Sequence, residues 1–118
     1  MNERIATRLH DALTACRRIE SITSGLDLTA YLQNDVVRLA IERLLEITGE
    51  ALNVASRDEP ELLAAIPDIA LAVGLRNKIA HDYDDISDEV IWDTITTDIP
   101  TMRRQIEAAM ADAPPLSP

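Results

Sequence analysis

Five residues within one short stretch carry the side chains that could perform chemistry in this sequence: Arg76, Asn77, Lys78, His81 and Tyr83. An imidazole can move the proton of an RNA 2′-hydroxyl or of a leaving oxygen near neutral pH. A guanidinium can stabilise the charge that develops on the phosphoryl oxygens in the same reaction. These residue types therefore fit transesterification of RNA without a metal ion.

The spacing of these residues fits a site on a helix, and it also fits a plain surface. Residues four apart share a helix face, so Asn77 can hold the orientation and tautomer of the His81 imidazole. Arg76 lies five residues before His81, about 140° away around an ideal helix. The two converge only if the helix ends at His81 or if a second subunit completes the site. In the plain interpretation, Arg76 and Lys78 are solvated, His81 favours the helix C-terminus and Tyr83 packs on a bundle.

The composition indicates what positions these residues. A chain of 118 residues and 13.0 kDa is the size of one domain. Three glycines, no phenylalanine and 3 % aromatic residues disfavour a many-stranded β fold. Alanine, leucine, isoleucine, glutamate and arginine are abundant instead, and this favours helices.

Apolar periodicity predicts four long helices, at about residues 2–23, 28–55, 67–81 and 87–112. The polar segment 56–66 is interpreted as a connector with a single-turn segment before the third helix. In the last helix the apolar positions keep phase across Pro100, which indicates a kink rather than a break. We therefore expect an all-α, up-and-down four-helix bundle over residues 1–112, followed by a flexible tail at 113–118.

The second predicted helix carries two neighbouring apolar stripes. One runs along Leu32, Val36, Ala40, Leu44, Ile47, Ala51 and Val54, and the other along Val37, Ile41, Leu45, Leu52 and Ala55. Together they exceed what one small bundle covers, so we expect a homodimer.

Other features bound the compartment and the partners. Cys16 lies on an apolar stripe and is expected to be a buried core thiol in a reducing compartment. No apolar run approaches the length of a membrane span and no signal-peptide core is present, so we expect a cytoplasmic protein. The net charge of −10 opposes nucleic-acid binding unless basic groups are concentrated in one place. His10 is expected at the surface, and Trp92 in the core or at a dimer interface.

The motif and its surroundings resemble a known family. Arg76, His81 and Tyr83 form the Arg-x4-His-x-Tyr signature of the HepT-like toxins of the HEPN superfamily. Residues 40–51 resemble that family's long second helix, and residues 92–95 and 98–100 resemble its last helix. The resemblance covers roughly residues 5–111.

The resemblance implies an all-helical homodimer that acts as a metal-independent ribonuclease without a cofactor. Arg76 and His81 of both subunits would be catalytic and face one cleft, with Asn77 and Lys78 in support and RNA rather than DNA as substrate. It also implies a toxin of a type VII toxin–antitoxin module, whose antitoxin is a minimal nucleotidyltransferase that transfers AMP to Tyr83. Each AMP adds bulk and about one negative charge beside the cleft, which would repel an RNA phosphate.

Two alternatives stay open. The chain could be a non-catalytic helical subunit that binds a nucleotide, or regulates a nucleotidyltransferase, with Arg76 and Lys78 holding phosphate. It could also be a dimeric scaffold without chemistry. Asp84 departs from the aromatic or uncharged residue that relatives often carry, and with Asp82, Asp85, Asp88 and Glu89 it makes the rim acidic. This acidic run is expected to be a solvated loop, with a weak divalent-ion site at His81 or a docking face for a basic partner as minor alternatives.

Overall fold

The computed structural model describes residues 1–81 and 86–111, and all regular structure in these ranges is α-helical. The helices are α1 (Glu3–Thr23), α2 (Leu28–Leu32), α3 (Asp35–Asp58), α4 (Leu62–Ala65), α5 (Ile69–His81) and α6 (Asp88–Ala111). The all-α class is confirmed, but the described residues form six helices and the expected count of four is wrong. The short α4 is the single turn expected in the connector. Tyr83, the acidic residues at 82, 84 and 85, and the expected tail lie outside the described residues.

The extra helix α2 arises because Asn34 divides the predicted second helix. The Asn34 side chain accepts a hydrogen bond from the backbone N–H of Val37, at 3.0 Å, and thereby caps α3. The backbone N–H of Gln33 closes the last turn of α2 on Thr29, at 3.1 Å. The carbonyl of Leu32 accepts a hydrogen bond from the Arg38 guanidinium. The Asn34 and Arg38 side chains replace helical bonds that an uninterrupted helix would make at this point, so apolar periodicity alone could not reveal the break.

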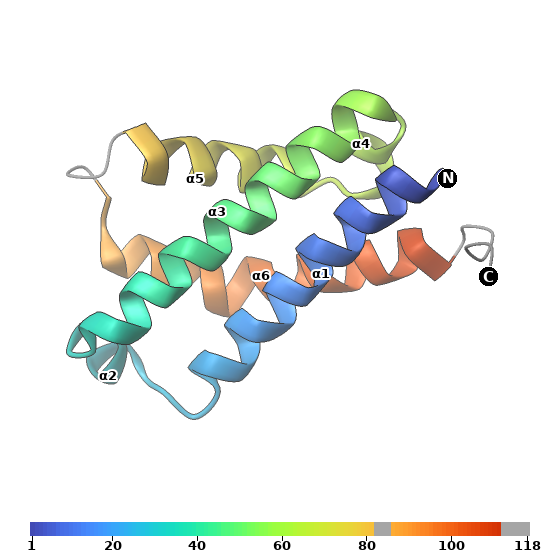
Figure 1. Ribbon diagram of the computed structural model, residues 1–118. Coiled ribbons are helices and arrows are strands. Elements are labelled where there is room, and N and C mark those ends of the chain that lie inside the picture. The colour runs from blue at the N-terminus through green and yellow to red at the C-terminus, as the bar shows by residue number, and fades with distance from the viewer. Residues whose placement is uncertain (82–85, 112–118) are drawn as a thin grey trace.

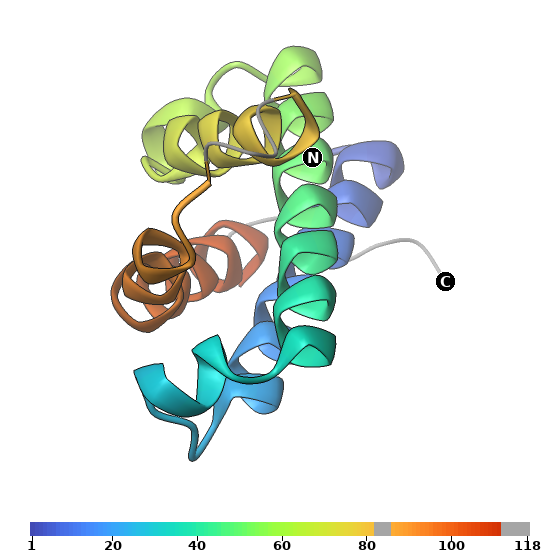
Figure 2. The same cartoon turned by 90° about the vertical axis from the view of Figure 1, so that its left-hand side faces the viewer.

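The four long helices alternate in direction, as expected for an up-and-down bundle (Figure 1). Helix α3 lies in the middle, with α1 packed along one side and α5 along the other. Helix α6 packs mainly against α1, and α2 closes the end of the molecule against α6 and α3 (Figure 2). Because α3 contacts both α1 and α5, residues on α1 and α5 can border one site.

The core confirms most of the predicted stripes. On α1 the apolar positions Ile5, Leu9, Ala12, Leu13, Cys16 and Ile19 are all buried. Helix α6 buries Ile91, Ile95, Ile99, Met102 and Ile106 on either side of Pro100. Of the two stripes on α3, the one that contains Ile41 and Leu52 faces the core. The other stripe is only partly covered, and Val36 is 77 % exposed. Trp92 is partly buried and packs on the Tyr31 ring, with 5.1 Å between the ring centroids.

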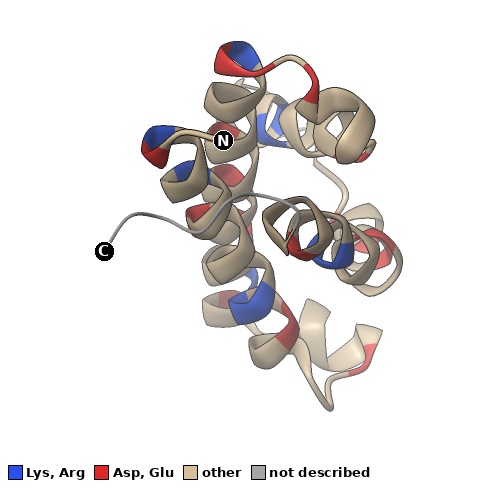
Figure 3. Cartoon of the chain, turned by 90° about the vertical axis from the view of Figure 1, so that its right-hand side faces the viewer, with Lys and Arg blue, Asp and Glu red and all other residues tan. Residues whose placement is uncertain are grey.

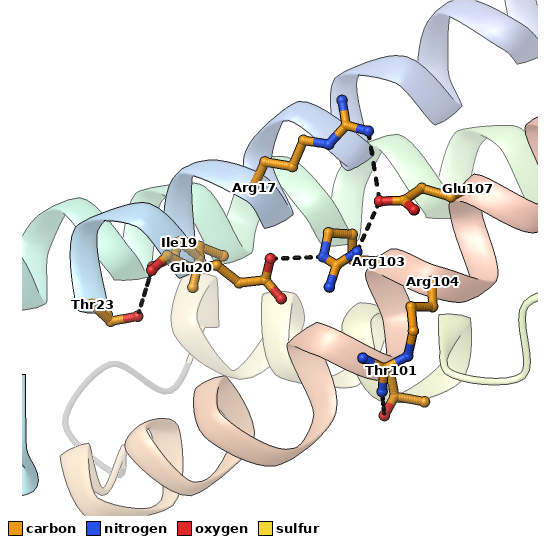
Figure 4. Close-up of polar contacts among 8 residues, drawn as sticks. All are labelled: Arg17, Ile19, Glu20, Thr23, Thr101, Arg103, Arg104 and Glu107. Atoms are coloured by element: carbon orange, nitrogen blue, oxygen red, sulfur yellow. Dashed lines mark hydrogen bonds and ion pairs between the residues drawn. The ribbon is translucent and has the colours of Figure 1, made fainter. Parts of the chain in front are cut away.

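A polar cluster fastens α6 to α1 (Figure 4). Arg103 donates from Nε to Glu20 Oε2 at 2.7 Å and from Nη1 to Glu107 Oε1 at 3.0 Å. Arg17 reaches the same Glu107 oxygen at 3.6 Å. Arg104, the next residue of α6, turns away from α1 and donates to Thr101.

In the described residues, no helix is long and apolar enough to cross a membrane.

Candidate active site

Arg76 is positioned by the buried stripe of α5. Ile69, Ala72 and Ile79 are buried on this helix, and Arg76 follows Ala72 by one turn. The Arg76 stem therefore faces α3, while its guanidinium reaches the surface with 30 % of the side chain exposed. An arginine that buries its stem and presents its head in this way keeps a defined direction.

Gly49 on α3 makes this placement of Arg76 possible. A Cβ atom added to Gly49 would lie 2.4 Å from the Cβ of Arg76 and 2.6 Å from the carbonyl oxygen of Ala72. Both distances are shorter than side chains tolerate, and one of the two atoms belongs to the backbone. Any larger residue at position 49 must push α5 away from α3, so the glycine sets the depth at which Arg76 sits.

Two polar groups hold the Arg76 guanidinium. Its Nη2 atom lies 3.3 Å from Oε2 of Glu50, the residue after Gly49. Its Nη1 atom donates to Asn77 Oδ1 at 3.0 Å. Asn77 therefore contacts Arg76, and no hydrogen bond joins Asn77 to His81 among the described residues.

His81 is the last residue of α5, and its side chain is exposed, like those of Asn77 and Lys78. It follows Arg76 by five positions, which places the two side chains about 140° apart around the axis. An exposed imidazole at the end of a helix is open to a phosphate or a hydroxyl from solvent. One protomer thus presents a fixed guanidinium and an accessible imidazole in different directions. Tyr83 of the motif lies outside the described residues.

Arg76 borders a groove that the sequence alone did not indicate. The groove has a volume of about 480 Å³ and runs between α1 and α3, with Arg76 contributed by α5. Its charged lining comprises Arg8, Asp11, Arg18, Arg43, Glu46 and Glu50, together with His10. His10 is exposed, as expected, although its place in this groove was not foreseen. No spacing in the sequence relates Arg8 and Arg18 to the motif, and only the packing of α1 on α3 brings them to this groove.

Cys16 is not a nucleophile in this fold. The residue is fully buried in α1, and this burial raises the pKa of the Cys16 thiol to about 12. A thiol with such a pKa stays protonated at neutral pH, and the thiolate is the reactive form. The expected role as a core thiol is confirmed.

The fold and the candidate site define a small all-helical protein with an arginine and a histidine on one helix. The family model described as Ribonuclease HepT-like matches residues 12–109. This match spans most of the chain and includes both Arg76 and His81, so the chain belongs to the HepT-like ribonuclease family. The resemblance that the motif indicated is confirmed.

Curated relatives support the same family. "Putative RNase MJ1380" of Methanocaldococcus jannaschii is 30 % identical over 99 residues, which cover 84 % of this chain and 90 % of the relative. "Putative RNase MJ0125" of the same organism is 30 % identical over 104 residues, with 88 % and 89 % covered. "Probable ribonuclease HepT" of Thermococcus cleftensis is 31 % identical over 99 residues, with 84 % and 89 % covered. No solved structure matches the chain significantly.

Proposed function

We propose that this protein is a metal-independent RNA endonuclease and the toxin of a toxin–antitoxin pair. The observation that carries the proposal is the placement of Arg76. Gly49 sets the depth of its stem, and Glu50 and Asn77 hold its guanidinium beside the groove. The same helix, α5, ends in His81. Membership of the HepT-like ribonuclease family and the names of the relatives point to the same chemistry.

The proposed reaction is a transesterification. The 2′-hydroxyl of one ribose attacks the adjacent phosphorus, the bond from phosphorus to the 5′-oxygen of the next nucleotide breaks, and a cyclic phosphate remains. His81 takes the hydroxyl proton or protonates the leaving oxygen. Arg76 stabilises the additional charge on the phosphoryl oxygens through its planar fork of N–H donors. The chain's own side chains supply each proton and charge in this scheme.

We propose that the active form is a homodimer. Arg76 and His81 of both subunits meet in one cleft of this dimer. The divergence of the two side chains within one protomer supports this, because a second copy can supply the missing group. Exposed apolar residues offer a contact surface, namely Val36 and Leu39 on α3 and Val90 on α6. The ion pair of Arg38 with Asp88, at 3.6 Å, joins the two helices at this surface.

The proposed control is modification of Tyr83 by a minimal nucleotidyltransferase antitoxin in the cytoplasm. Tyr83 follows His81 by two residues, so an AMP group on its hydroxyl would place bulk and negative charge beside the imidazole. RNA phosphates would then be repelled from the site.

The test is an RNA-cleavage assay in excess chelator on protein that is expressed alone or together with its proposed nucleotidyltransferase antitoxin. We expect cleavage by the protein expressed alone, and its loss in His81→Ala and Arg76→Ala, while Arg104→Gln on the far side of α6 stays active. Mass spectrometry of the co-expressed form should show an AMP-sized addition on Tyr83, and this form should not cleave. Undiminished cleavage by His81→Ala would overturn the assignment of the site. Saturable nucleotide binding without cleavage would favour the alternative of a nucleotide-binding subunit.

A further inference from the structure

The groove between α1 and α3 has a charge of the opposite sign to the rest of the chain. The net charge of the whole chain is −10, and both signs of charge recur along its helices (Figure 3). The groove lining nevertheless carries four arginines against three carboxylates. Positive charge concentrated in a concave surface raises the local concentration of anions. This groove is therefore a place where the chain can approach a polyanion.

Arg8 and Arg18 are the free cations of this groove. Both side chains are exposed, and neither forms an ion pair with any residue in the described part of the chain. By contrast, the Arg76 guanidinium lies 3.3 Å from Glu50, and Arg43 lies 4.0 Å from Glu46. In the described part of the chain no carboxylate lies within ion-pair distance of Arg8 or Arg18, although Asp11 lines the same groove, so both guanidinium groups are available to an incoming phosphate.

The geometry favours a chain of phosphates over a single one. Arg8 and Arg18 are ten residues apart on α1, which corresponds to roughly 15 Å along the helix. Several phosphates along a strand can contact both side chains over this length. The groove floor includes the apolar residues Ala15, Leu44 and Ile47, against which a base or a ribose can pack. Arg76 borders the same groove, so a strand lying in it also meets the candidate catalytic arginine.

We propose that the groove between α1 and α3 holds the single-stranded RNA next to the scissile phosphate, with Arg8 and Arg18 bound to its phosphates. The proposal rests on the proposed ribonuclease function and adds the binding track that leads the substrate to Arg76. Contacts of this kind position a strand without reading its sequence. They also explain how a chain with a net charge of −10 binds RNA.

The experiment measures binding of a short fluorescent single-stranded RNA across a salt series. His81→Ala serves as the background so that the RNA stays intact. Arg8→Gln and Arg18→Gln are each compared with Arg104→Gln, which makes the same change of charge outside the groove. Each groove variant should bind several times more weakly at low salt. Each should also lower the slope of log affinity against log salt by about 0.7, the contribution of one phosphate contact on a single strand. Arg104→Gln should change neither quantity.

Further measurements distinguish a failure of this proposal from a failure of the proposed function. In the His81-containing background, Arg8→Gln and Arg18→Gln should raise KM for RNA cleavage and leave kcat near the starting value, because they bind remote phosphates. If the starting protein cleaved RNA and the groove variants bound RNA normally, this proposal alone would be overturned. Absence of both binding and cleavage in the starting protein would overturn the proposed function as well. If the variants kept RNA binding and lost binding to the nucleotidyltransferase, the groove would be a protein-docking surface instead.

Discussion

Gly49 and Arg76 approach each other so closely that a Cβ atom on Gly49 would lie 2.4 Å from the Cβ of Arg76. This contact sets the separation of α3 and α5 at the candidate active site. It also explains why a glycine is present in the middle of a long helix, where it costs about 1 kcal/mol relative to alanine.

Gly49→Ala should lower both stability and activity. Over-packing costs about 1–3 kcal/mol, which exceeds the gain in helix propensity. RNA cleavage should fall further than the loss of folded protein explains, because the first displaced atoms belong to Arg76 and its helix. Thermal unfolding and cleavage assays measure the two effects.

Gly74→Ala is the matched control for this substitution. Gly74 lies on α5 with no atom within 4 Å of an added Cβ, so alanine there should stabilise the fold by about 0.5–1 kcal/mol. Cleavage should be unchanged. If Gly49→Ala raised the unfolding temperature as Gly74→Ala does, the close contact would not constrain the site.

Glu50→Gln should strengthen RNA binding. The Glu50 carboxylate lies 3.3 Å from the Arg76 guanidinium and competes with a substrate phosphate for it. Exposed ion pairs of this kind contribute about 0.2–1 kcal/mol, so the affinity for RNA should rise by up to about fivefold. Glu61→Gln makes the same change at an exposed position outside the groove and should have no effect. Weaker binding by Glu50→Gln would show that this carboxylate orients Arg76 rather than competing with substrate.

Cys16 should resist alkylation in the folded protein. Its thiol is buried, with a pKa raised to about 12 by that burial, so almost no thiolate forms at pH 8. Iodoacetamide should label the chain rapidly in guanidinium chloride and only slowly under native conditions, as followed by intact mass. Fast native labelling would show that α1 opens readily from the bundle.

Glu107→Gln should destabilise the bundle at neutral pH and lose this effect in acid. The Arg103 guanidinium, which donates a hydrogen bond to Glu107, lowers the pKa of that carboxyl below its ordinary value of 4.5. A carboxyl with a lowered pKa in the folded state stabilises the fold above the unfolded pKa, and this contribution disappears as the pH falls through the folded pKa.

Thermal unfolding between pH 7 and pH 3 measures this dependence. The unfolding temperatures of the original protein and of Glu107→Gln should differ at pH 7 and converge below about pH 4.5. The Glu61 carboxylate forms no ion pair among the described residues, so Glu61→Gln should follow the original protein throughout. A constant difference at every pH would assign the effect of Glu107 to packing instead of charge.

The sequence by itself determined the helical character, the buried stripe of α1 and the continuation of α6 through Pro100. It also located the motif residues Arg76 and His81, and with them the family. These features depend on the period of the helix and on local residue types, which are readable within one segment. The break at Asn34 is also local, but a capping side chain leaves the apolar pattern intact, so periodicity did not predict the break.

Only the tertiary structure decided what surrounds Arg76. Glu50 and the groove arginines Arg8, Arg18 and Arg43 come from helices that are distant in sequence, and nothing in their spacing relates them to the motif. They meet because α3 packs against both α1 and α5, at a distance that Gly49 permits. Packing also left Val36 exposed on a stripe that periodicity alone would bury. Periodicity gives each helix its apolar face, but only the packing of several helices decides which polar residues come to share a site.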